Sequence, residues 1–425
     1  MADNPPPDAN RRAGKKRGAK SGKVADFRYK RSNQPKGRSR DDQKRGQSDS
    51  RDRGQNGRQS GAQQGSRSHA SAKRPEQSGK FNANSAPRKG EAYAALDLGT
   101  NNCRLLIARP SGKDFTVIDA FSRVVKLGED LASTGRLSDE AMDRALGALS
   151  ICADKLRRRN VRLARSVATE ACRRASNGDA FIERVRRETG IVLDIISAEE
   201  EARLAVLGCH ILLEHGHGPA VIFDIGGGST ELVLIEPGGK IPHIIDWQSV
   251  PWGVVSLTDT IGRNGTGKEA RLDRYARMRA AVSESFAPFA ERIAEAAKSD
   301  DIRLLGTSGT VTTLASLHLE LPHYDRKAVD GLIVPSHSMR EISTRLSGMS
   351  PDERSELPCI GRDRADLVVA GCAILEAILD LWPADRLGVA DRGIREGILR
   401  SLMAAERQSE RSLKALAETR AGKSG

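Results

Sequence analysis

The chain has 425 residues, enough for two or three domains, and a formal net charge of +13. That charge is unevenly spread, because residues 1–90 hold 24 Lys and Arg against 8 Asp and Glu, whereas the rest holds 45 basic and 48 acidic residues. No apolar run approaches the roughly 18 residues that a membrane span requires, and no signal-peptide pattern opens the chain. Six scattered cysteines without zinc-site spacing are typical of reduced thiols, so we expect a cytoplasmic protein with no membrane partner.

The basic segment, residues 1–90, is rich in Gly, Ser, Gln, Asn, Lys and Arg, and Phe27, Tyr29 and Phe81 are its only aromatic residues. Such a composition buries too little apolar surface to offset the entropy of ordering, so we predict a disordered tail. The tail is either a solvated segment that improves solubility or an arm that binds a polyanion, RNA or polyphosphate, through counterion release.

The folded part is predicted to begin with a β-hairpin that has a polar turn. Residues 93–96 form an apolar strand that ends in Asp97, and residues 103–108 form its partner. Hydroxyl, amide and guanidinium groups at such a turn can donate to phosphate oxygens, although an ordinary hairpin is the alternative. The candidate phosphate ligands of this first turn are Gly99, Thr100, Asn101, Asn102 and Arg104.

A strand (115–125), an amphipathic helix capped by Ser138 (138–159) and another strand (161–168) are expected next. In open α/β sheets ligands bind at the carboxyl ends of strands. Arg173 follows the last of these strands, so it is a candidate phosphate ligand, with an ordinary surface arginine as the equally weighted alternative.

An acidic cluster opens a long predicted helix that runs from Ala198 to about Leu213, after a helix at residues 178–189 and a short strand at 193–197. Glutamates in a first helical turn complement the helix dipole. The alternative is that one glutamate of the cluster points into a cleft and activates a water as general base.

The most informative stretch is a second hairpin with a turn of three glycines. Residues 220–223 form an apolar strand that ends at Asp224, and residues 232–235 follow Glu231 as the partner strand. Glycines let backbone N–H groups approach an oxyanion closely and form an anion-binding nest, while the two flanking carboxylates suit Mg²⁺ beside phosphate. The order of these parts favours a phosphate and metal site over a glycine-rich hairpin with two surface acids. The candidate phosphate ligands of this second turn are Gly226, Gly227, Gly228 and Ser229.

A third glycine- and hydroxyl-rich loop follows a strand at residues 302–305 and precedes a helix at 311–319. A helix N-terminus of this kind is a ready anion site, and its candidate ligands are Thr307, Ser308 and Gly309. The other elements that we expect in this half of the chain are a strand-like run (241–257), helices (271–297, 336–346, 364–382), strands (331–335, 387–390), a last helix to about Arg407, and a polar, frayed end.

Six motifs between about Tyr93 and Met403 together resemble one protein family. They are Asp97-Leu98-Gly99-Thr100-Asn101, Ile195-Ile196-Ser197-Ala198-Glu199-Glu200-Glu201-Ala202-Arg203, Asp224-Ile225-Gly226-Gly227-Gly228-Ser229-Thr230-Glu231, Gly306-Thr307-Ser308-Gly309-Thr310, Arg364-Ala365-Asp366 and Asp391-Arg392-Gly393-Ile394-Arg395-Glu396-Gly397. In this order they resemble the Ppx/GppA phosphatases, which comprise exopolyphosphatases and guanosine pentaphosphate phosphohydrolases. The chain departs from the family pattern at Asn102, at Ala198 and in Glu170-Ala171-Cys172, and none of these departures removes a carboxylate.

The resemblance implies an actin-like ATPase fold with two ribonuclease-H-like α/β domains and a cleft between them. We therefore expect domain I at residues 91–198 with the helix 394–408, domain II at 199–393, and a polar tail at 409–425. A homodimer is the expectation that the family suggests. The chain resembles the short, two-domain form of the family.

The resemblance also implies the roles of the acids. Glu201 would orient the attacking water, and Asp224 and Glu231 would serve the water and Mg²⁺, with Asp97 as a further metal ligand. The expected reaction is hydrolysis of the terminal phosphate of polyphosphate or guanosine pentaphosphate. The alternatives are an actin-like-fold ATPase or sugar-kinase-like phosphotransferase, which share paired Asp–Gly hairpins, and a non-catalytic protein that binds polyphosphate or RNA.

Overall fold

The computed structural model describes most of the chain after the basic segment: residues 90–112, 114–236, 241–262, 265, 267–298 and 302–421, with the backbone alone at 410 and 413–421. The predicted disordered tail, residues 1–90, lies outside the described residues except for Gly90. Two sheets organise the described part, and both belong to one unit of the chain, Lys80–Gly425.

The first sheet has the strand order β3-β2-β1-β4-β5. Its strands are β1 (Ala92–Leu98), β2 (Asn102–Ser111), β3 (Asp114–Val124), β4 (Val161–Ala168) and β5 (Asp194–Ile195). β1 pairs antiparallel with β2 and parallel with β4, so the first predicted hairpin is confirmed, with Asp97 opposite Arg104. The carboxyl ends of β1 and β4 therefore meet at one edge of the sheet.

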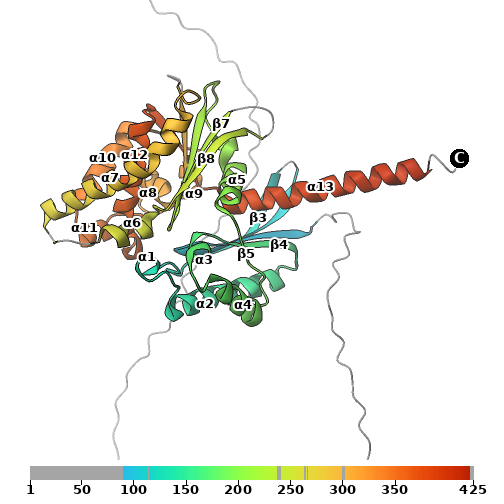
Figure 1. The fold of residues 1–425 in the computed structure, drawn as a ribbon. Helices are drawn as coiled ribbons and strands as arrows, with labels where there is room; N and C mark the ends of the chain where they lie inside the picture. The colour runs from blue at the N-terminus through green and yellow to red at the C-terminus, as the bar shows by residue number, and fades with distance from the viewer. Residues whose placement is uncertain are drawn as a thin grey trace, which may run out of the picture. The chain divides into compact units, whose positions relative to one another are not determined.

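Helices cover both faces of this first sheet (Figure 1). The face that carries Ala94 and Leu96 packs on α2 (Asp139–Arg158) and α4 (Gly178–Thr189). The short helices α1 (Leu131–Thr134) and α3 (Glu170–Arg174) contribute side chains to the same core. The Ser138 hydroxyl accepts a hydrogen bond from Ala141 N, which confirms the predicted N-cap of α2. The sheet and the helices α1 to α4 are called the five-stranded lobe below.

The second sheet has the order β10-β11-β9-β6-β7-β8. Its strands are β6 (Ala220–Ile225), β7 (Thr230–Glu236), β8 (His243–Val250), β9 (Arg303–Thr307), β10 (Ile333–Pro335) and β11 (Arg386–Ala390). β6 pairs antiparallel with β7, with Asp224 opposite Glu231, and parallel with β9. The second predicted hairpin is thus confirmed, and its two flanking acids face each other across the ladder.

The largest core lies between the second sheet and a layer of helices (Figure 1). The helices that follow β8 are α6 (Val254–Ile261), α7 (Lys268–Ile293), α8 (Gly309–His318), α9 (Arg326–Val329), α10 (Ser336–Gly348), α11 (Pro351–Ser355) and α12 (Leu367–Leu381), with a 3₁₀ turn at Arg362–Arg364. α12 is buried along almost its whole length, as its apolar sequence predicts. The second sheet and these helices are called the six-stranded lobe.

Helix α5 (Ala198–Cys209) packs on both sheets, and a 3₁₀ turn (His210–Leu212) follows it. Leu204 and Ala205 share a core with the first sheet, whereas Ala202 and Val206 share one with the second. The predicted domain boundary at residues 198/199 stays a prediction, since α5 is common to both lobes.

Helix α13 (Ile394–Ala421) crosses α5 closely enough that glycines are required at the contact. A Cβ at Gly208 would lie 2.0 Å from Gly393 O, and one at Gly397 would lie 2.0 Å from Leu204 O. Backbone cannot yield at that distance, so the two glycines set how closely the helices approach. The crossing holds the N-terminus of α13 against the last turn of α5, and the next turn of α13 against Leu204.

The two predicted elements that differ most from the structure are the strand-like run at 241–257 and the last helix. The strand-like run at 241–257 is β8 followed by α6, because the amides of Val254 and Val255 bond to the carbonyls of Gly226 and Gly227 and start a helix there. The last helix does not end near Arg407 but continues to Ala421, through most of the segment expected to be a polar tail.

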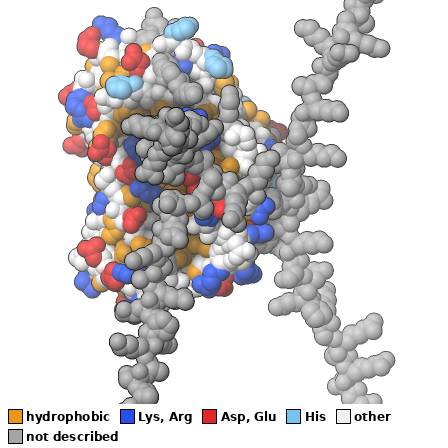
Figure 2. Space-filling model, turned by 90° about the vertical axis from the view of Figure 1, so that its right-hand side faces the viewer, with side chains coloured by type: hydrophobic (Ala, Val, Ile, Leu, Met, Phe, Trp, Pro, Cys, Tyr) orange, Lys and Arg blue, Asp and Glu red, His pale blue; other side chains and the backbone are white. Residues whose placement is uncertain are grey.

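The surface and the cysteines agree with the charge and composition of this part of the chain. Basic and acidic side chains are interspersed on the face shown in Figure 2. All six cysteines are free, and five of them are buried. Among the described helices, none is both long and apolar enough to cross a membrane.

Candidate active site

The two predicted turns face each other across the gap between the lobes. A Cβ at Gly227 would lie 3.0 Å from Thr100 Cβ, and one at Gly228 would lie 2.7 Å from Thr100 Oγ1. Glycine is therefore needed at these positions to let the turn of the six-stranded lobe meet the turn of the five-stranded lobe. Both turns line one pocket of about 960 Å³, a volume that includes the open solvent at its mouth.

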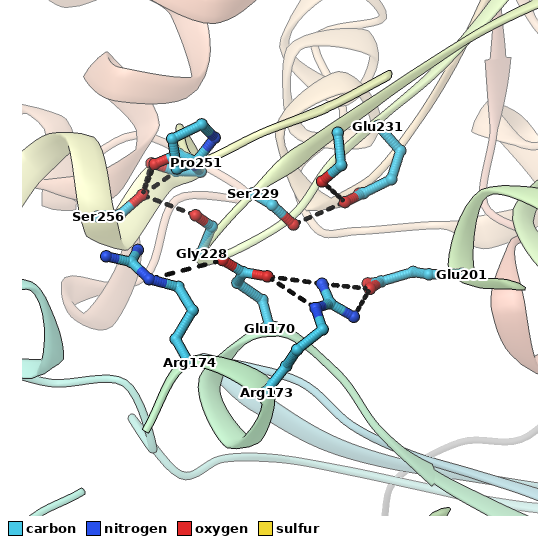
Figure 3. A network of polar contacts seen from close by, with 11 residues as sticks. Glu170, Arg173, Arg174, Glu201, Gly228, Ser229, Glu231, Pro251 and Ser256 are labelled. Carbon is cyan, nitrogen blue, oxygen red and sulfur yellow. Dashed lines mark hydrogen bonds and ion pairs between the residues drawn. The ribbon is translucent and has the colours of Figure 1, made fainter. Parts of the chain in front are cut away.

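In both turns the backbone carbonyl groups are occupied by hydrogen bonds to neighbouring segments of the chain. The Gly226 and Gly227 carbonyls accept from the first amides of α6, and the Gly228 carbonyl accepts from Ser256 Oγ at 2.9 Å (Figure 3). In the other turn the Thr100 and Asn101 carbonyls accept from amides of the segment after β3. Within the described residues, the amides of Gly227 and Gly228 have no hydrogen-bond partner, which leaves two neighbouring N–H donors beside the pocket.

The four acids predicted for the site, from three separate parts of the chain, line the same pocket: Asp97, Glu201, Asp224 and Glu231. Burial raises the pKa of Asp224 to about 8, and the charge of Glu231 adds to the rise while Arg104 opposes it. Burial also raises the pKa of Asp97, against the positive charges of Arg104 and Arg395. Glu201 and Glu231 are buried, and Asp97 and Asp224 are half-buried. A cluster of such carboxylates is costly to ionise without a cation, and such clusters are found at functional sites.

Hydroxyl groups hold Glu231 in place at the base of the cluster. Its Oε1 accepts a hydrogen bond from Ser229 Oγ at 2.6 Å (Figure 3) and another from Ser249 Oγ at 3.0 Å. Burial raises the pKa of Glu231, and these two hydrogen bonds oppose the rise because they favour the charged carboxylate. The hydroxyl of Ser229, which lines the pocket, therefore donates its hydrogen bond to Glu231.

Glu201 lies in the first turn of α5 and is bound by Arg173 from the five-stranded lobe. Both terminal nitrogens of Arg173 donate to Glu201 Oε2 at 3.1 Å, and Arg173 also bonds to Glu170 Oε2 at 2.6 Å (Figure 3). Burial and the charge of Glu231 raise the pKa of Glu201 well above its usual range, and Arg173 opposes that rise. The ion pair therefore supports the ionised carboxylate of Glu201 in a buried place.

The third predicted anion site lies on the opposite wall, at the N-terminus of α8. Ser308 caps this helix by accepting from the amides of Thr310 and Val311, and Gly309 follows it. The Arg364 guanidinium lies over Gly309, 3.6 Å from where a Cβ would be, and its one hydrogen bond among the described residues is a long one, 3.4 Å, to Thr313. A guanidinium without a carboxylate partner is available to an anion.

The structure brings nearly all of the predicted site residues together. Those that line the pocket are Asp97, Gly99, Thr100, Asn101, Asn102, Arg104, Glu201, Asp224, Gly226, Gly227, Gly228, Ser229, Glu231, Ser308 and Gly309. The two that do not line it are Thr307, whose hydroxyl donates to Arg392 O at 2.7 Å, and Arg173, which reaches Glu201 from behind. That these residues contact the substrate stays a prediction.

Sequence reasoning missed several lining residues, of which Glu170 and Arg364 carry charge. Glu170 lies two residues after the end of strand β4, and its spacing of three residues from Arg173 was a readable sign of an ion pair. Arg364 precedes α12 in a short polar motif, and the sequence gives no sign that it faces the distant α8.

A magnesium site was predicted here, and the residues fit one only in part. Within the described residues, no three His, Cys, Asp or Glu side chains come together closely enough to hold a metal ion by themselves. Mg²⁺ is usually held by one or two carboxylates together with substrate phosphates and water. The lining also has a buried oxygen, Asn101 Oδ1, that has no hydrogen-bond partner in the described part of the chain. An amide so placed can serve a bound water or, in its flipped orientation, a phosphate.

Comparisons with known proteins agree on one family. A family model described as the Ppx/GppA phosphatase family matches residues 106–406. Exopolyphosphatase 2 of Mycobacterium tuberculosis is 31% identical over 323 residues, which are 73% of this chain and 98% of that protein. The crystal structure of the Aquifex aeolicus member of the Ppx/GppA protein family matches with 29% identity and a TM-score of 0.60, over 74% of this chain and 98% of that one. An exopolyphosphatase structure from Cytophaga hutchinsonii matches with 25% identity and a TM-score of 0.65, over the same shares.

Proposed function

Because the chain belongs to the Ppx/GppA phosphatase family, we propose that it is an exopolyphosphatase, which hydrolyses the terminal phosphate of inorganic polyphosphate. Guanosine pentaphosphate presents a terminal phosphate of the same chemistry and is the second substrate that we propose. The observation that carries the proposal is the convergence of Glu201 with two glycine-containing turns in one pocket. The names of the matched relatives agree with it.

Phosphate would bind where donors and unpaired cations face the pocket. The Gly227 and Gly228 amides lie on one wall, and the Arg364 guanidinium lies on another, beside the N-terminus of α8. Arg104 lines the pocket between Asp97 and Asp224 and has no ion pair with a carboxylate among the described residues. These groups would hold successive phosphates of a chain whose end reaches the acids.

Mg²⁺ would be held by one or two of the carboxylates of Asp97, Asp224 and Glu231, together with phosphate oxygens and water. This would explain why a pocket for a polyanion contains carboxylates. When bound, the ion would neutralise negative charge that develops on the phosphates. Ser229 and Ser249 would fix the orientation of the Glu231 carboxylate for this role.

The water would be activated by Glu201. Arg173 occupies only Oε2 of that carboxylate, so Oε1 is left to accept a proton from water. The water oxygen forms a bond to the terminal phosphorus, the bridging P–O bond breaks, and the shortened chain leaves with the electron pair of that bond. Catalysis of this kind consists of positioning and electrostatic stabilisation, without a covalent enzyme intermediate.

The basic segment gives the protein a second way to meet a polyanion. Its 24 Lys and Arg would bind polyphosphate or RNA and keep it near the pocket. A cytoplasmic location and a homodimer, both expected from the sequence, stay proposals.

A phosphate-release assay tests the proposal. Purified protein should release orthophosphate from long-chain polyphosphate and from guanosine pentaphosphate with Mg²⁺, and release should stop when EDTA is added. ATP serves as the comparison substrate. Faster release from ATP than from either proposed substrate would show an ATPase instead, and binding of polyphosphate without any release would show a binding protein.

A further inference from the structure

Glu170 is an acid in the pocket lining, and the proposed mechanism gives it no role in binding the metal or activating the water. It is the first residue of α3, its side chain is 12% exposed, and its Cγ lies 2.8 Å from where a Cβ of Gly228 would be. A negative charge is thus placed beside the turn that is proposed to hold phosphate. Such a charge opposes binding of a polyanion, so it needs another explanation.

The explanation lies in how Arg173 uses its hydrogen-bond donors. A guanidinium has five N–H groups. Two of them, on Nε and Nη2, reach Glu170 Oε2 at 3.1 and 2.6 Å. Two more, one on each terminal nitrogen, reach Glu201 Oε2, and the fifth, on Nη1, reaches Ile196 O at 2.8 Å. All five are in use, so Arg173 has none left for a phosphate oxygen while it holds Glu201.

We propose that Glu170 is a positioning residue: it fixes the plane of the Arg173 guanidinium, and Arg173 in turn holds Glu201 by Oε2 with Oε1 free for the water. Glu170 has this role only if the protein hydrolyses polyphosphate as proposed above. Its contact along the Nε edge of the guanidinium prevents rotation about the bonds of the flexible arginine side chain. Glu170 also lies at the contact between the two lobes, because it belongs to α3 and its side chain lies against Gly228.

The second arginine near Glu170 makes a useful contrast. Arg174 lies 3.7 Å from Glu170 Oε1, is 40% exposed, and makes the kind of solvated pair that contributes little (Figure 3). Arg173 is 22% exposed and approaches to 2.6 Å. The carboxylate of Glu170 is therefore committed to Arg173, the arginine that reaches the proposed general base.

The test separates kcat from KM on long-chain polyphosphate. In Glu170→Gln, kcat should fall on the order of tenfold or more, because a misplaced general base loses rate steeply with distance. KM should not rise, since a negative charge beside the phosphate turn is removed. Glu170→Asp, which keeps the charge on a shorter side chain, should recover part of kcat.

Glu200→Gln is the matched control. Glu200 neighbours Glu201 on α5 but bonds to Arg165 and Arg203, away from Arg173, so both constants should stay at the wild-type values. Thermal unfolding midpoints establish that each variant is folded; if Glu170→Gln does not fold, Glu170→Asp carries the comparison. In a double-mutant cycle, Glu170→Gln should have little further effect on Arg173→Lys, because lysine cannot make the planar fork.

Three results would overturn this role for Glu170: a folded Glu170→Gln variant with wild-type kcat, a rise in KM with unchanged kcat, or full multiplication of the two single effects in the double variant. A wild-type protein that releases no phosphate from polyphosphate would instead overturn the proposed function, and the role of Glu170 with it. Active wild-type protein with an equally active Glu170→Gln variant would overturn only the role of Glu170.

Discussion

Arg173 contacts Glu201 with both of its terminal nitrogens, and both hydrogen bonds, each 3.1 Å long, end on the same carboxylate oxygen, Oε2. An arginine that faced a carboxylate side by side would occupy both oxygens. The one-sided contact keeps the buried Glu201 beside a positive charge and leaves its other oxygen, Oε1, outside the ion pair. It also ties the first turn of α5 to α3, so the proposed base is held by two elements rather than one.

The cluster of acids predicts how stability depends on pH when no divalent cation is bound. The pKa of Asp224 is raised from 3.8 to about 8, so the folded state holds a proton that the unfolded chain has released between these values. Stability is therefore present at low pH and is lost as the pH rises through this window. With EDTA present, the thermal unfolding midpoint of the wild type should fall relative to that of Asp224→Asn between pH 5 and pH 8, by a few degrees. A difference between the two proteins that is constant over this range would contradict the raised pKa.

The turn of three glycines predicts a second variant. A Cβ at Gly228 would meet Thr100 Oγ1 at 2.7 Å and Glu170 Cγ at 2.8 Å, so Gly228→Ala should displace these side chains and widen the contact between the turns. We expect kcat/KM on polyphosphate to fall at least about tenfold, because near-attack geometry is lost. Gly147→Ala in α2 is the control: its Cβ meets nothing within 4 Å, and alanine should leave activity unchanged and raise helix stability slightly. Equal activity of the two variants would show that the turns need not meet.

Deletion of residues 1–90 tests the role of the basic segment. The described fold begins at β1, and the segment carries the excess positive charge, so kcat on a short polyphosphate should stay unchanged. Binding of long polyphosphate should weaken, and the slope of log affinity against log salt should become less steep, because fewer counterions are released. An unchanged slope would mean that the segment acts as a solvated tail only.

Local patterns predicted the parts of the site well. In both hairpins an apolar strand ends in an aspartate and a glycine-containing turn follows, and each step is a short-range preference of those residues. The predicted N-cap Ser138 and the buried helix α12 are of the same kind. The meeting of Glu201 with Asp224 was expected only from the family resemblance, since no local pattern reports a contact between separate elements.

Long-range contacts explain what was missed. Helix α6 begins where its first amides bond to the carbonyls of Gly226 and Gly227. The sequence does not show these bonds, so the apolar start of α6 resembled a continuation of the preceding strand. The pairing of Arg173 with Glu201 spans 28 residues and cannot be read from spacing, whereas its pairing with Glu170 could have been. Helix α13 continues past Arg407 into polar sequence, which lacks the apolar stripe on which a helix prediction depends.

The most direct measurement for the whole account is kcat of Glu201→Gln on long-chain polyphosphate with Mg²⁺, with polyphosphate affinity measured on the same protein. Glutamine keeps the size of the side chain and can still accept from Arg173, but it is far too weak a base to take a proton from water. We predict that turnover falls by about 10²-fold or more, the scale of a lost general base, while polyphosphate still binds. A folded Glu201→Gln variant that retained the wild-type kcat would contradict the assignment of Glu201, and with it the reaction centre proposed here.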